Sequence, residues 1–207
     1  MCSEITNRPC PCSGAVAKMM PLDHGYALYG SLCYALPQMH GDGRQWQVLP
    51  VRGEPAGTML RLTASSELRI RTPLPEVDEL LRLSGSRLEI DYSIIRLGDA
   101  TIKSLRPCPD LQSRMVIIKS SGTERADEES FWPSFCKQLA PLVDTPDPVK
   151  ALIGQRRVMQ VAGYRVVGWQ MFVHGLSAID SMRVQANGIG AKRKMGCGSF
   201  VPAKPCH

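Results

Sequence analysis

The order of predicted elements is the feature that most limits how this chain can fold. Hydrophobic spacing and turn residues predict strand, helix, strand, strand, helix, strand in the first half, and the same order again in the second. This order is typical of the split βαβ, ferredoxin-like (RRM-like) unit. The turn-forming segment Arg106-Pro107-Cys108-Pro109-Asp110 separates the two halves. We therefore expect an α+β fold of two tandem ferredoxin-like units, residues 1–107 and 108–207.

The clearest element of the first half is a helix. Leu28, Leu32 and Leu36 share one helical stripe, and Pro37 ends the pattern. A second helix is predicted to begin at Pro75, and residues 1–9 are predicted to be a frayed end. Residues 58–62 and 67–72 are predicted to pair as a hairpin. The other predicted strands are 13–19, 46–51, 88–90, 93–97 and 100–105.

The second half repeats this order with stronger signals. Residues 114–119 are predicted to form a strand and 128–142 a helix. Residues 157–161 and 165–173 are predicted to pair as a hairpin. Ser177 is expected to cap a last helix that ends at Asn187-Gly188, before a closing strand at Phe200-Val201.

A basic glycine loop connects the last predicted helix to the last strand. Lys192, Arg193 and Lys194 stand between two glycine pairs, Gly188 with Gly190 and Gly196 with Gly198. Glycine permits positive φ and close backbone approach, while lysine and arginine supply charge and donors for phosphate. No acidic residue follows Asp180. The loop suits a polyanion; the alternative is an ordinary loop of glycine turns with solvated lysines.

Composition limits the class of protein. A hydrophobic content of 43% in 207 residues fits a folded chain, and the net charge of +6 is compatible with a nucleic-acid partner. The chain shows no signal peptide and no apolar run long enough for a membrane helix, so we expect it to be cytoplasmic. The eight cysteines fit no zinc spacing, so no metal or cofactor is expected. One composite zinc site stays open as an alternative: Cys10, Cys12, Cys206 and His207.

Two segments carry a resemblance to a known family. One is the loop Gly188–Gly198 between the last helix and the last strand; the other is Asp23-His24-Gly25-Tyr26-Ala27-Leu28-Tyr29, which places a histidine at the first helix. With the element order from about Ser13 to Pro202, the chain resembles the CRISPR-associated repeat-RNA processing endoribonucleases, the Cas-six type of the RAMP superfamily.

The resemblance implies both a reaction and partners. Such proteins bind precursor CRISPR transcripts and cut them within each repeat, beside a stem-loop. The cut needs no metal: the ribose 2′-hydroxyl attacks the adjacent phosphate and leaves a 2′,3′-cyclic phosphate and a 5′-hydroxyl. The guide RNA product can stay bound, which makes the nuclease a subunit of a Cascade-like interference complex. The protein must then supply proton transfer, cations and in-line geometry.

Histidines are the first candidates for proton transfer. The resemblance favours His24, with an exposed or capping role as the alternative; His40, in the glycine-rich loop after the helix, is the other candidate for the main proton carrier or its partner. Tyr29 is expected to orient the 2′-hydroxyl or stack a base, with a core position as the alternative. His174 is predicted to be structural, and His207 is terminal.

The RNA is expected to contact the basic loop. Lys192, Arg193 and Lys194 would hold it, with Gly188, Gly190, Gly196 and Gly198 shaping the backbone. Arg69 and Arg71 alternate with apolar residues in a predicted strand, which indicates either a surface that tracks the RNA backbone or a merely solvated face.

Three rival functions remain open. The first is a non-catalytic RAMP-fold subunit that holds the guide RNA. The second is an RRM-like RNA-binding module, which would place aromatic residues in its central strands; the strand RMVIIK has none. The third is a nucleotide-dependent enzyme, which the loop fits poorly, because Arg193 replaces the third glycine of G-x-G-x-x-G.

Overall fold

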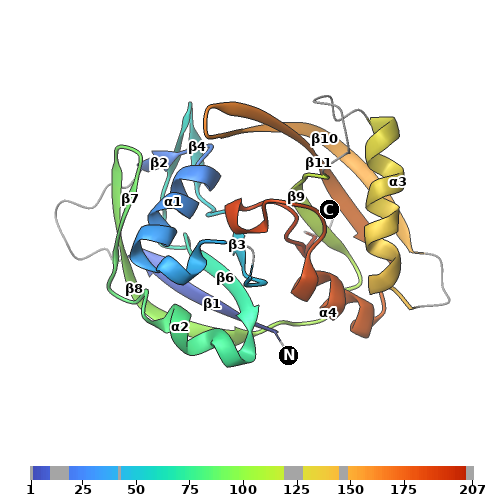
Figure 1. The fold of residues 1–207 in the computed structure, drawn as a ribbon, viewed down its shortest axis with the longest axis horizontal. Coiled ribbons are helices and arrows are strands. Elements are labelled where there is room, and N and C mark those ends of the chain that lie inside the picture. Colours follow the sequence, from blue (N-terminus) through green and yellow to red (C-terminus); the bar gives the residue numbers. More distant parts are fainter. Residues whose placement is uncertain (1, 10–18, 42, 119–127, 145–148, 204–207) are drawn as a thin grey trace. The chain divides into compact units, whose positions relative to one another are not determined.

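A computed structural model describes residues 2–9, 19–41, 43–118, 128–144 and 149–203 of the chain (Figure 1). The chain divides into two compact units, Met1–Ser104 and Leu105–His207. None of the helices within the described residues is long and apolar enough to cross a membrane.

The first unit is built on a five-stranded antiparallel sheet with the order β3-β6-β1-β8-β7. Its strands are β1 (Cys2–Pro9), β3 (Gln47–Leu49), β6 (Leu68–Pro73), β7 (Arg87–Ile90) and β8 (Ser93–Ser104). Its helices are α1 (Gly25–Ala35) and α2 (Val77–Leu81), with 3-10 turns η1 (Pro37–Met39) and η2 (Leu74–Glu76). A separate small sheet contains β2 (Met19–Pro21), β5 (Met59–Arg61) and β4 (Glu54–Ala56).

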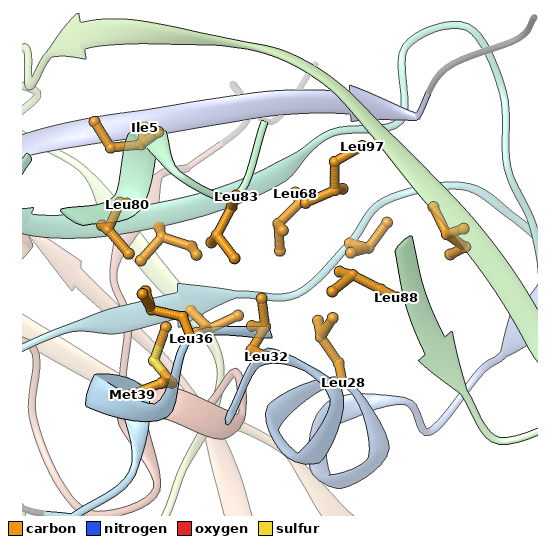
Figure 2. Close-up of a cluster of buried hydrophobic side chains, with 14 of the residues drawn as sticks. Ile5, Leu28, Leu32, Leu36, Met39, Leu68, Leu80, Leu83, Leu88 and Leu97 are labelled. Carbon is orange, nitrogen blue, oxygen red and sulfur yellow. The ribbon is translucent and has the colours of Figure 1, made fainter. Parts of the chain in front are cut away.

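The core of this unit lies between the helices and one face of the sheet. Leu28 and Leu32 of α1 are at most 2% exposed, as the leucine stripe predicts. Figure 2 shows them pointing toward side chains of the strands and of the segment around α2. The partners labelled there are Ile5, Leu36, Met39, Leu68, Leu80, Leu83, Leu88 and Leu97.

Three sequence predictions for the first unit are wrong. The strands predicted separately at 93–97 and 100–105 form one continuous strand, β8. Residues 2–9 form the central strand β1, not a frayed end; its sequence is mostly polar, and only Ile5 joins the core cluster, so the alternation that marks a strand is missing. The expected hairpin of 58–62 with 67–72 does not form. Instead β5 pairs with β2 and β4, while β6 pairs with β1 and β3. Most of the expected strand 13–19 lies outside the described residues.

The second unit has a four-stranded antiparallel sheet with the order β10-β11-β9-β12. Its strands are β9 (Leu111–Val116), β10 (Lys150–Val161), β11 (Tyr164–His174) and β12 (Val201–Pro202). Its helical segments are α3 (Glu128–Leu139), η3 (Ala140–Leu142), α4 (Ala178–Asn187) and η4 (Arg193–Met195). In each unit, the first and third strands of the ferredoxin-like pattern are neighbours inside the sheet: β1 and β6 in the first unit, β9 and β11 in the second. This confirms the predicted α+β fold of tandem ferredoxin-like units.

The second unit agrees closely with its predicted elements. The Ser177 hydroxyl accepts a hydrogen bond from the Asp180 N–H at 3.1 Å, which confirms the predicted helix cap. The long hairpin of β10 and β11 turns at Ala162 and Gly163, both with positive φ. Phe131, Phe135 and Phe200 form the centre of a core that also contains apolar residues of β9, β11 and α4.

Candidate functional site

The glycine loop, Gly188–Gly198, is fixed by backbone hydrogen bonds. Its ends are joined by the bond from the Ile189 N–H to the Gly198 oxygen, at 2.9 Å. Two further bonds attach it to the chain at the end of β9: Ala191 N–H donates to Ile117 and Gly198 N–H to Met115, each at 2.7 Å. The loop therefore continues the edge of the sheet next to β9.

Glycine is needed at two points of this loop. A Cβ at Gly190 would lie 2.4 Å from the Ile117 carbonyl oxygen, and one at Gly198 would lie 2.2 Å from the Ile189 oxygen. Both residues also have positive φ, +90° and +67°. A side chain at Gly190 would push the loop away from the segment after β9, and one at Gly198 would push apart the two ends of the loop, so these glycines give the loop its shape.

Within this loop, Arg193 and Lys194 lie in the turn η4, and Lys192 stands at its N-terminal cap. Lys192 takes the left-handed conformation at φ +61°, and its carbonyl accepts from the Met195 N–H at 2.8 Å. The Arg193 guanidinium donates to the Asn187 carbonyl at 2.6 Å. Among the described residues, Lys192 and Arg193 form no ion pair with an acid.

An open depression of about 500 Å³ lies at the start of the loop. The Gln138 amide oxygen, from α3, accepts a hydrogen bond from the Gly190 N–H at 2.9 Å and so connects this helix to the loop. A space of this volume admits a nucleotide-sized group. Sequence reasoning missed it, because its lining combines distant segments: Ile118, Ser134, Lys137, Gln138, Pro141, Leu142, Asn187 and Gly188.

His24, a candidate for proton transfer in the sequence, is buried and hydrogen-bonded inside the first unit. It is 3% exposed and stands at the start of α1. Its Nε2 accepts from the Val51 N–H at 3.1 Å, so the Nδ1–H donates to the Pro21 carbonyl, also at 3.1 Å. Both ring nitrogens are therefore occupied in joining backbone segments of the first unit.

His40 is the exposed histidine of the first unit. It ends η1, where its backbone N–H donates to the Pro37 carbonyl at 3.0 Å. Arg44 anchors the far end of the following loop through ion pairs with Glu76 at 3.2 Å and Glu79 at 2.9 Å. The hydrogen bond to Glu76 is the main cause that raises the pKa of Arg44. The imidazole of His40 forms no hydrogen bond with any side chain or backbone group in the described ranges.

Tyr29 lies on the core side of α1. It is half-buried and packs against the hydrophobic core of the first unit. The exposed tyrosines of the same helix are Tyr26, at 41%, and Tyr34, at 92%. This geometry fits the core alternative that the sequence left open for Tyr29.

Arg69 and Arg71 do not form an exposed cationic face, which corrects the expectation of an RNA-tracking surface. The side chain of Arg71 is 2% exposed, and its Nε donates to the Glu4 carboxylate at 3.0 Å. Arg69 is 16% exposed and lies 3.8 Å from the same carboxylate. Burial is the largest effect on both guanidinium groups and lowers their pKa, while Glu4 opposes it. The alternative zinc ligands Cys10, Cys12, Cys206 and His207 lie outside the described residues.

Comparison with known proteins gives consistent matches over most of the chain. The family model described as Cas6 Crispr matches residues 15–205. The chain is 35% identical over 185 residues to the CRISPR-associated endonuclease Cas6 of Myxococcus xanthus strain DK1622, covering 88% of this chain and 76% of that protein.

Solved structures share the fold at low sequence identity. A Cas6-related protein from Pyrococcus furiosus has a TM-score of 0.69 at 14% identity, covering 99% of this chain and 100% of that one. Thermus thermophilus Cse3, bound to an RNA that represents a pre-cleavage complex, has a TM-score of 0.50 at 16% identity, covering 98% and 99%. At these identities the likeness shows the fold alone.

Proposed function

This chain belongs to the Cas6 family, and from that premise we propose that it binds CRISPR repeat RNA and cuts it as an endoribonuclease. The observation that carries the proposal is the match of the family model to residues 15–205, together with 35% identity to a Cas6 endonuclease. The basic glycine loop supports it, because Lys192 and Arg193 stand on a fixed backbone and form no ion pair within the described part of the chain. RNA-bound Cse3 of Thermus thermophilus shares the fold.

The proposed reaction uses the RNA's own nucleophile and no metal. The 2′-oxygen forms a bond to phosphorus while the bond from phosphorus to the 5′-oxygen breaks. The proton of the 2′-hydroxyl passes to a base, and the 5′-oxygen receives a proton from an acid. The products are a 2′,3′-cyclic phosphate and a 5′-hydroxyl. Proton transfer of this kind contributes about 10²–10⁴-fold to the rate.

We assign proton transfer to His40. Its imidazole is exposed, whereas both nitrogens of His24 are already hydrogen-bonded inside the first unit. An imidazole can accept and return a proton near neutral pH. The glycine loop of the second unit is proposed to hold the RNA phosphates, with Lys192 and Arg193 as the cations and with Lys194 beside them.

The second candidate function is a subunit that holds the guide RNA without cutting it. Burial of His24 favours this candidate, because it removes one of the two histidines expected to act in the first unit. Retention of the product and assembly with other subunits of a Cascade-like complex are compatible with either function.

The deciding experiment incubates the protein with a labelled CRISPR repeat hairpin in EDTA. The wild type should make one cut, which a 2′-deoxy substitution at the cut position abolishes. His40→Ala should bind the hairpin but cut it at least about 100-fold more slowly. Gln38→Ala, an exposed neighbour in η1, is the matched control and should cut normally. A wild type that binds tightly and never cuts would establish the guide-holding subunit instead.

His24→Ala tests the structural assignment in the same assay. It should still cut at a temperature at which the variant remains folded. A folded His24→Ala protein that binds but does not cut would return the proton-transfer role to His24.

A further inference from the structure

An aromatic surface lies on the face of β11 opposite the helices. Alternate residues of a strand point to opposite faces, and Met171 and Val173 are fully buried in the core that contains α3 and α4. Phe172 and His174 therefore lie on the other face. Their rings are nearly parallel, with planes 10° apart and centroids separated by 6.3 Å.

Neighbouring residues orient the His174 ring and accommodate the Phe172 ring. The Asp110 carboxylate, which is half exposed, lies 3.0 Å from Nδ1 of His174. Gly154 of β10 leaves room for the other ring, since a Cβ there would lie 3.0 Å from Cε2 of Phe172. The hydrogen bond to Asp110 therefore orients the His174 ring, which lowers the entropy cost of binding.

The groups around these rings suit a nucleotide. Lys150 is exposed and is the direct cross-strand partner of His174. With Asp110 accepting from Nδ1–H, Nε2 of a neutral His174 is an acceptor, and it has no partner among the described residues. Residues 150–175 contain four lysine and arginine residues and no acid, and the Asp110 carboxylate contacts the ring of His174.

We propose that Lys150, Phe172, His174 and Asp110, the β11 platform, bind one unpaired nucleotide of the RNA. The base stacks on the Phe172–His174 pair, Lys150 contacts a phosphate, and Nε2 accepts a hydrogen bond from the nucleotide's 2′-hydroxyl or a base N–H. The platform deepens the proposed function and rests on it for the source of the RNA. It also explains why the strand RMVIIK lacks aromatic residues: the stacking positions lie in β11.

The test measures binding of a short single-stranded RNA that carries one 5-iodouridine. The double variant Phe172→Leu with His174→Asn should lower affinity about tenfold, because stacking of one base on aromatic side chains is worth roughly that much or more. Light-induced cross-links in the wild type should map to Phe172 or His174. Tyr164→Ala, which removes a 77% exposed ring at the tip of the same hairpin, should change neither result.

Lys150→Ala provides a second variant that leaves the rings and the core intact. It should reduce the slope of log affinity against log salt by about 0.7, the value for one contact to single-stranded nucleic acid. Wild-type affinity in the folded double variant would overturn the proposal, as would cross-links that map elsewhere. A double variant that keeps RNA affinity but loses a protein partner would reassign the surface to protein docking.

The platform proposal and the cleavage proposal can be contradicted independently of each other. Cleavage is scored on the unmodified repeat hairpin, whereas the platform is scored by binding and cross-linking of RNA that need not be cut. An inactive wild type would contradict the cleavage proposal and leave the platform result readable.

Discussion

Two basic regions of this chain use their cations in opposite ways. In the first unit, Arg69 and Arg71 stand on regular strand β6 and share the carboxylate of Glu4, their neighbour on β1. In the second unit, Lys192 and Arg193 stand on a turn of the glycine loop and share no acid among the residues described there. Basic segments that look alike in the sequence thus have different roles: the arginines of β6 stabilise the sheet, whereas the cations of the glycine loop are open to a ligand.

The difference teaches that the acid partner, more than the number of cations, decides the role of a basic segment. A buried arginine needs a carboxylate to offset its desolvation, and Glu4 lies more than sixty residues from Arg71 along the chain. A cation on a loop keeps its hydration and can exchange it for phosphate. The two regions should therefore respond differently when their charges are removed.

Removal of Glu4 should have the largest effect on stability. Glu4→Ala leaves the 2% exposed side chain of Arg71 without its carboxylate, and breaking a buried pair in this way costs about 3–5 kcal/mol. Urea unfolding monitored by circular dichroism would measure the loss. Glu89→Ala, which breaks an exposed pair with Arg87 in the same sheet, is the control and should cost about 1 kcal/mol or less. Equal losses in both variants would show that Arg71 does not depend on Glu4.

The second unit could be predicted from its sequence in most respects, because its signals are local. The cap at Ser177, the phenylalanines of α3 and the turn at Ala162-Gly163 each lie within the element they define. The first unit was harder, because β1 is specified by its partners. Polar residues such as Thr6 and Asn7 are buried there because β1 pairs with β6 and β8. No hydrophobic periodicity within residues 2–9 predicts this burial.

The candidate site likewise has features that local sequence predicts and features that depend on distant contacts. The shape of the glycine loop follows from its glycines, and these are visible in the sequence. The role of His24 depends on Pro21 and Val51, one close and one distant along the chain, and the platform at His174 depends on Asp110. Contacts that join separate segments decide whether a histidine is structural or open to a ligand, and single-sequence patterns do not report them.

The loop backbone should be the next most sensitive feature. Gly198→Ala adds a Cβ at 2.2 Å from a carbonyl oxygen and at positive φ, which together should cost about 2–4 kcal/mol. Thermal unfolding would measure this cost, and RNA binding should weaken as the cations shift. Gly30→Ala is the matched control: nothing lies within 4 Å of the added Cβ, and alanine in helix α1 should stabilise the protein by about 0.5–1 kcal/mol. Equal behaviour of the two variants would contradict the close approach at Gly198.

Neutralising the loop cations should weaken RNA binding without unfolding the protein. Replacement of Lys192, Arg193 and Lys194 by alanine should reduce the salt slope of affinity by about 2–3 units, at 0.7–0.9 per phosphate contact. Between about 50 and 200 mM salt, the wild type should lose roughly 20- to 40-fold more affinity than the variant. Fluorescence anisotropy on the repeat hairpin measures both values. An unchanged slope would contradict phosphate contacts by this loop.

The smallest expected effect is at Lys192, where one substitution should change protein stability and RNA binding in opposite directions. Lys192 holds a positive φ that favours glycine, so Lys192→Gly should raise stability by about 0.5–1 kcal/mol while it weakens RNA binding. Its salt slope should fall by less than one unit. Ala162→Gly, at φ +50° in the uncharged hairpin turn, should also gain stability but leave RNA affinity unchanged. If Lys192→Gly raises stability but weakens RNA binding, and Ala162→Gly only raises stability, then a strained residue is kept at position 192 for its charge. A Lys192→Gly protein with wild-type affinity would instead place Lys192 with the structural cations of the first unit.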